Sequence, residues 1–88
     1  MRFQLGRLLI TPGALLFCRE NSINVFGLVK RHEGGDWSDL DQEDRAANER
    51  ALLEGTRVFS AYKFPQGKLW VITEADRSAT TVLLPEEY

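Results

Sequence analysis

The last third of the chain has the clearest alternation of apolar and polar residues, and it predicts three β-strands. One face of the first strand, within residues 57–64, carries Val58, Ser60, Tyr62 and Phe64. Residues 69–73 and 79–84 form the next two strands, and turns at 65–67 and 74–78 join them. Strands joined by such short turns pair as an antiparallel meander.

A further strand over residues 3–10 and a first helix are predicted at the start of the chain. Thr11 is a suitable N-cap and Pro12 a suitable first residue for a helix that ends at Asn21. A hairpin turn at Pro12 and Gly13 is the alternative.

A second helix is predicted to begin at Ser22, as its N-cap, and to end at the glycine pair after residue 33. Helical spacing relates Val25, Leu28, Val29 and His32. A strand over residues 23–29 is the alternative.

The third helix, over residues 41–54, has the strongest signals. It has a capping-box-like start at Ser38, acidic residues in its first turn and Gly55 at its end. Its apolar face is narrow, so most of it must face water or a partner, and Trp37 is expected to anchor it to the core. The predicted fold class is α+β, with two or three N-terminal helices packed on a three- or four-stranded antiparallel sheet.

Size and composition are those of one globular domain, residues 1–88, with 43% hydrophobic residues. No apolar run approaches the ~20 residues of a membrane helix, and the first residues lack a signal-peptide pattern. We therefore expect a cytoplasmic protein with no membrane contact. The one cysteine, Cys18, is expected in the core, with a reactive thiol beside Arg19 as the alternative.

Charge is unevenly distributed along the chain. Residues 33–54 carry eight acidic residues and two arginines, whereas residues 1–32 carry five basic residues and one glutamate. The net charge of −2 and the pI near 5.3 disfavour direct nucleic-acid binding, since such domains are typically basic. The acidic segment instead predicts a protein partner with a basic surface.

We predict seven residues as candidates for binding a partner, and they lie in two loops and at the start of one helix. They are Asp36, Trp37, Asp39, Asp41, Glu43, Asp44 and Arg77. Each also has an ordinary structural interpretation, since acids cap helices, tryptophans fill cores and arginines extend into water.

Motifs for catalysis, metals and cofactors are missing from the sequence. The chain has one histidine, His32, and neither a phosphate-binding nor a dinucleotide-binding glycine motif, so no metal and no cofactor are expected. The sequence therefore favours a non-enzymatic protein that binds another protein, and two alternative functions remain. A small ribonuclease or toxin-like enzyme would use His32 as a base with cations such as Arg57, Lys63, Lys68 and Arg77. A homodimer would pair residues 79–84 as a sheet edge.

Near its C-terminus the chain carries the pattern W-x-I-T-E-A-D-R-S-x-T-T-x-L-L-P-x-E-Y over residues 70–88. With Thr11-Pro12-Gly13-Ala14-Leu15 and the segment from Arg31 to Leu40, it resembles a family of small bacterial proteins met on plasmids and integrative elements. The function of that family is not established, and no catalytic residues carry over. The resemblance implies a mobile-element accessory protein. Because acids spaced along one side of a helix can imitate a row of phosphates, the acidic segment makes a nucleic-acid-binding defence complex of the host a candidate target.

Overall fold

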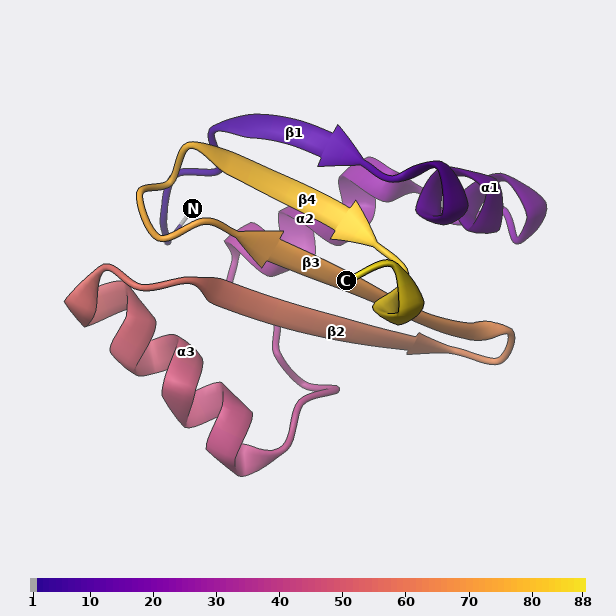
Figure 1. Ribbon diagram of the computed structural model, residues 1–88. Coiled ribbons are helices and arrows are strands. Elements are labelled where there is room, and N and C mark those ends of the chain that lie inside the picture. Colours follow the sequence, from indigo (N-terminus) through magenta and orange to yellow (C-terminus); the bar gives the residue numbers. More distant parts are fainter. Residues whose placement is uncertain (1) are drawn as a thin grey trace.

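Four strands form one sheet in the order β1-β4-β3-β2 in a computed structural model that describes residues 2–88 (Figure 1). The strands are β1 (Arg7–Ile10), β2 (Val58–Phe64), β3 (Gly67–Thr73) and β4 (Ala79–Leu83). The antiparallel pairs β2–β3 and β3–β4 confirm the predicted meander. The prediction of a purely antiparallel sheet is wrong, because β1 pairs with β4 in parallel.

The parallel pair is held at both of its ends. At its start, Gly6 has a φ of +65° and lies so close to the Ser78 carbonyl that a Cβ would clash with it. At its far end, the Glu87 carboxylate accepts the Thr11 hydroxyl and the amides of Gly13 and Leu84, at 3.0 and 2.9 Å for the two amides. The end of β4 is thereby joined to the residues that follow β1.

The three helices are α1 (Pro12–Glu20), α2 (Val25–Glu33) and α3 (Gln42–Glu54). As predicted, Thr11 caps α1, and α3 ends at Gly55, which adopts a left-handed conformation. Two predicted caps are wrong. Asn24 caps α2 in place of Ser22, which lies in the preceding turn with a φ of 54°, and Asp41 caps α3 in place of Ser38.

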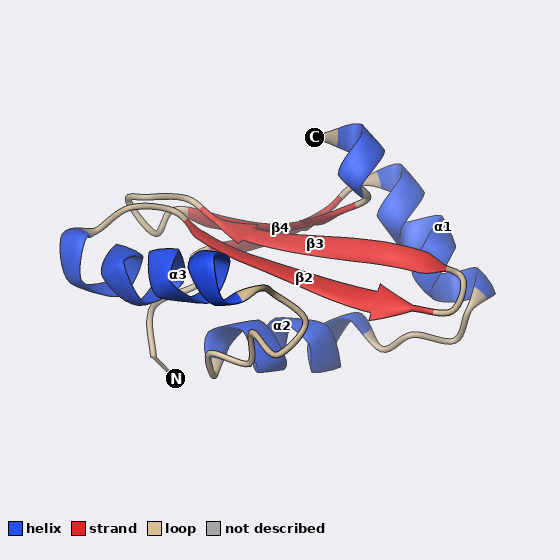
Figure 2. Cartoon of the chain, turned by 90° about the horizontal axis from the view of Figure 1, so that it is seen from below, coloured by secondary structure: helices blue, strands red, loops and turns tan. Residues whose placement is uncertain are grey.

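Helices α2 and α3 lie on the same side of the sheet, and α1 lies at one end of it (Figure 2). A short 3-10 helix, η1 (Pro85–Glu87), follows β4 on the opposite side (Figure 2). The main core lies between α1, α2 and the sheet; its members include Cys18, Leu28, Val29, Tyr62, Leu69 and Val71. A second cluster joins α3 and the loop before it to β2 and comprises Phe3, Trp37, Leu40, Ala51, Val58 and Ala61.

Strand β4 is an interior strand, so the expectation that residues 79–84 form a sheet edge is wrong. The two edges of the sheet are β1 and β2. The strand predicted over residues 3–10 is shorter in the structure, because β1 begins only at Arg7.

Candidate functional site

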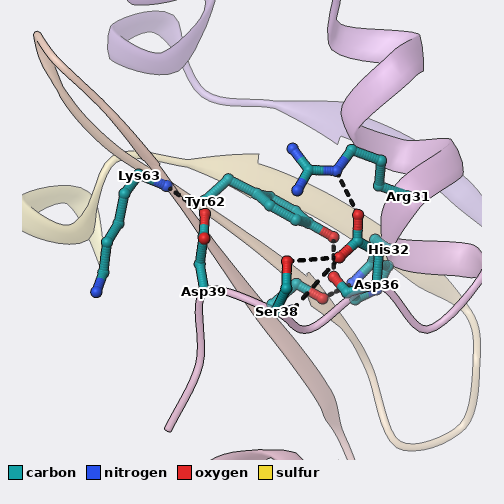
Figure 3. A network of polar contacts seen from close by, with 8 residues as sticks. Arg31, His32, Asp36, Ser38, Asp39, Tyr62 and Lys63 are labelled. Carbon is teal, nitrogen blue, oxygen red and sulfur yellow. Dashed lines mark hydrogen bonds and ion pairs between the residues drawn. The ribbon is translucent and has the colours of Figure 1, made fainter.

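The loop before α3 is fastened to the molecule by the side chain of Asp36. Arg31 Nε donates to Asp36 Oδ2 at 2.7 Å, and the Ser38 hydroxyl donates to Asp36 Oδ1 at 2.9 Å (Figure 3). The hydrogen bond from Arg31 is the main cause that lowers the pKa of Asp36 below its usual value. Asp36 therefore has a structural partner within its own chain.

Tyr62 holds the same loop from the sheet. Its hydroxyl donates to the Asp36 carbonyl at 2.9 Å, and the Arg31 guanidinium lies over its ring at 4.4 Å from the centroid (Figure 3). Burial raises the pKa of Tyr62 to about 12. The loop is thus held to the rest of the molecule through both the side chain and the backbone carbonyl of Asp36.

Trp37 is buried in the second core cluster, where only 5% of it is exposed. The Arg2 guanidinium lies 5.1 Å from the centre of its ring. Trp37 anchors the chain just before α3, as its structural interpretation predicts.

Asp39 and Asp41 both cap backbone amides. Asp39 Oδ2 accepts the Lys63 amide of β2 at 3.0 Å (Figure 3), and Asp41 Oδ1 accepts the Asp44 amide in the first turn of α3 at 2.8 Å. Among the seven predicted residues, Glu43 and Asp44 remain with exposed carboxylates that make no ion pair within residues 2–88.

Arg77 has a role that neither sequence interpretation predicted. Its guanidinium donates to the carbonyls of Ala51 and Thr56 at 3.2 and 2.6 Å, and to those of Glu74 and Ala75 in its own turn. It therefore ties its own turn to the C-terminal end of α3, where the Ala51 carbonyl also accepts the amides of Gly55 and Thr56. The acidic loop and Arg77 are brought to the two opposite ends of α3, not to one common site.

A buried polar network surrounds His32. Its Nδ1 lies 2.5 Å from the Ser60 hydroxyl, and its Nε2 lies 2.8 Å from the Thr73 hydroxyl. Thr73 contacts Thr80 at 2.6 Å, and the Thr80 hydroxyl donates to the Leu5 carbonyl at 2.7 Å. His32, Ser60, Thr73 and Thr80 are all fully enclosed.

The direction of every proton in this network follows from its last member. A carbonyl can only accept, so Thr80 donates to Leu5 and Thr73 donates to Thr80. His32 Nε2 must then donate to Thr73, and Nδ1 accepts from Ser60. Burial lowers the pKa of His32 to about 4, because the charged form would lose its hydration.

Two of the residues that the ribonuclease alternative would use, His32 and Arg77, thus have structural partners. His32 is enclosed as a neutral side chain, and Arg77 is bonded to backbone carbonyls. Residues 2–88 hold no cluster of three or more side chains that could bind a metal ion. Cys18 is buried, and burial raises the pKa of its thiol.

The two edges of the sheet differ in how their backbone groups are used. At the β2 edge, Asn48 of α3 accepts the Phe59 amide at 2.9 Å and donates to the Phe59 carbonyl at 2.5 Å. Asp39 accepts the Lys63 amide on the same edge. At the β1 edge, no strand from residues 2–88 pairs with the outer side.

The β1 edge adjoins an apolar groove between β1 and α2, with a volume of about 140 Å³. It is lined by Leu8, Leu9, Ile10, Val25, Phe26, Val29 and Val82, which we call the β1 patch. Phe26 is 75% exposed, so the patch places a large apolar side chain in water. The sequence patterns predicted elements in this region but did not predict the groove.

No protein-family model matches this chain, and neither a curated protein nor a solved structure does so. Within the described residues, none of the helices has the length and apolar character needed to span a membrane. What the protein does is therefore inferred from its own residues.

Proposed function

We propose that the protein is a non-enzymatic protein-interaction module that presents the outer face of α3 to a partner with a basic surface. The observation that carries this proposal is that α3 is fixed in place although most of its residues are exposed. Ten of its thirteen residues are exposed, the others being Asn48, Ala51 and Leu52. A helix that buries so little contributes little to the core.

Polar contacts nevertheless fix α3 at several points along its length. Asp41 caps its first turn, Asn48 holds its middle, and Arg77 holds its last turn. Arg2 pairs with Glu49 at 2.9 Å. Rigid presentation of an unburied surface favours binding, because less conformational entropy is lost when a partner docks.

The exposed face offers both charge and apolar area. Glu43, Asp44 and Glu54 are exposed and make no ion pair within residues 2–88. Leu53, next to Glu54 in the sequence, is 88% exposed. Such a surface suits a partner whose cations meet the acids and whose apolar groups cover the leucine. A nucleic-acid-binding complex of the host has that character.

The experiment compares two charge-matched triple variants in capture from a host lysate. Glu43→Gln, Asp44→Asn and Glu54→Gln remove three negative charges from α3, while Glu20→Gln, Glu74→Gln and Glu86→Gln remove three negative charges elsewhere. We expect a basic protein to be captured by the wild type and the control but lost with the α3 variant and at high salt. Equal capture by both variants, or capture indifferent to salt, overturns the proposal.

A further inference from the structure

The outer edge of β1 is complementary to a second copy of itself. Arg7 and Thr11 donate their amides to the Ser78 and Val82 carbonyls of the β4 side, both at 3.0 Å. Successive residues of a strand direct their backbone groups to opposite sides, so Leu8 and Ile10 direct theirs away from β4. Figure 1 shows no element beyond β1 on that side.

We propose that the chain forms a homodimer by antiparallel pairing of β1 with β1 of a second copy, about a two-fold axis at Leu9. In this register Leu8 of each copy lies opposite Ile10 of the other. Each such pair exchanges both of its N–H···O hydrogen bonds. The outward groups of the strand are then all used, and the two four-stranded sheets join into one.

The register also determines which side chains of the two copies face each other. Arg7 of one copy faces Thr11 of the other, so the two arginines lie at opposite ends of the seam and do not repel each other. Leu8 and Ile10 lie on the α2 side, because their β4 partners Thr80 and Val82 do so. They come together there with Leu8 and Ile10 of the second copy, and Phe26 of each copy borders this apolar cluster.

Leu9 lies between Leu8 and Ile10, so its side chain points to the opposite side of the sheet, and the residue is 42% exposed. At the axis it meets Leu9 of the second copy, as a pair that does not exchange hydrogen bonds and whose Cα atoms are about 4.5 Å apart. A contact between two equivalent patches closes after two copies and leaves no further β1 edge. The β2 edges, with α3, would lie at the two outer ends of the dimer.

The outward backbone groups of β1 match those of an identical strand placed antiparallel to it about a two-fold axis. This match favours a second copy of the chain over a strand of another protein. The register places apolar residues opposite apolar residues across the seam and separates its only charges. The inference does not depend on the proposed docking of α3, which lies on the other edge of the sheet.

Disulfide trapping tests the register directly. Leu9→Cys, made in a Cys18→Ala background, places two thiols at the axis, where the Cα distance lies within the range of a disulfide. We expect rapid formation of a covalent dimer under mild oxidation. Leu16→Cys is the control for random collision, because Leu16 is 55% exposed on α1 and lies outside the β1 patch.

Light scattering over a series of concentrations tests the dimer without a cross-link. We expect a dimer for the wild type and, for Leu9→Lys, a dissociation constant at least about tenfold higher, since two ammonium groups would meet at the axis. Leu16→Lys adds the same charge and should leave the dimer intact; circular dichroism checks that both variants fold. A wild type that stays monomeric, or Leu9→Cys that cross-links no faster than Leu16→Cys, overturns the proposal.

Discussion

The two edges of the sheet solve the same physical problem in different ways. An edge strand exposes unpaired N–H and C=O groups, which invite another strand to pair with them. At β2 three of these groups are taken by side chains, since Asn48 bonds the amide and the carbonyl of Phe59 and Asp39 accepts the amide of Lys63, and α3 lies alongside. At β1 the edge is short and bare, and exposed apolar residues adjoin it.

This difference shows that the fold can protect an edge with only a few polar side chains. Asn48 alone satisfies both backbone groups of Phe59. Within residues 2–88 no side chain bonds to the outer backbone groups of β1 in this way, and Leu8 and Leu9 are 47% and 42% exposed. The contrast is that β2 is partly covered by side chains of the molecule itself, while the outer side of β1 pairs with no strand from residues 2–88.

A low pH is expected to have the largest effect on stability, because it protonates His32 in the buried network that joins α2 to β2, β3 and β4. His32 has a pKa of about 4 in the folded state, against about 6.5 when exposed. The unfolded chain therefore binds the proton first, and stability is full above pH 6.5 and falls as the pH drops toward 4. The loss amounts to about 3 kcal/mol across this window.

Urea unfolding at a series of pH values measures this loss. Because His32 is the only histidine, NMR titration of its ring reports the folded-state pKa without ambiguity. The ring should remain neutral, with the proton on Nε2, at pH 6. A stability that is flat from pH 6.5 to 4.5, or a ring that titrates near 6.5, contradicts the enclosed network.

Removal of the Asn48 side chain should give the next largest effect. Asn48→Ala leaves both the amide and the carbonyl of Phe59 without their partner, at a cost of about 2 kcal/mol. Urea unfolding again gives the measurement. Gln42→Ala removes an exposed amide from the same helix and should cost less than about 0.5 kcal/mol. Equal costs for the two variants would mean that Asn48 does not protect the edge.

Local signals were sufficient to predict the helices and the meander. The Thr11-Pro12 pair, the acidic first turn of α3 and Gly55 each describe a helix end within a few residues. His32 was placed at helical spacing with Leu28 and Val29, and the structure confirms that this face is buried. Its partners Ser60 and Thr73 lie far along the chain, so no spacing could show the network.

The pairing of β1 could not be predicted for a related reason. Alternation shows which face of a strand is buried, but it does not show which strand lies beside it or in which direction. The contacts of Arg77 were equally hidden, since its turn gives no sign that the end of α3 lies within reach. Asn48 did leave a signal, as a polar residue at helical spacing from Ala51, which is buried.

A smaller effect is expected at the second protected position of β2. Asp39→Ala removes the acceptor of the Lys63 amide, which water can partly replace because Lys63 is exposed, so the cost should be about 1 kcal/mol. Asp39→Asn keeps an acceptor oxygen and should remain close to the wild type in thermal unfolding. If both variants lose the same stability, the charge of Asp39 matters more than its hydrogen bond.

The smallest effect on a single copy is expected at β1, and here concentration separates the two edges. Leu9→Thr alters a side chain that is already 42% exposed, so in dilute solution it should cost less than about 1 kcal/mol. If β1 pairs with a second copy, the wild type gains stability as its concentration rises, by mass action, and Leu9→Thr gains less. The difference in melting temperature between the two proteins should therefore widen with concentration, whereas the deficits of Asn48→Ala and Asp39→Ala should stay constant. If the deficit of Leu9→Thr in melting temperature is equally constant, β1 is an edge that needs no partner, as β2 is.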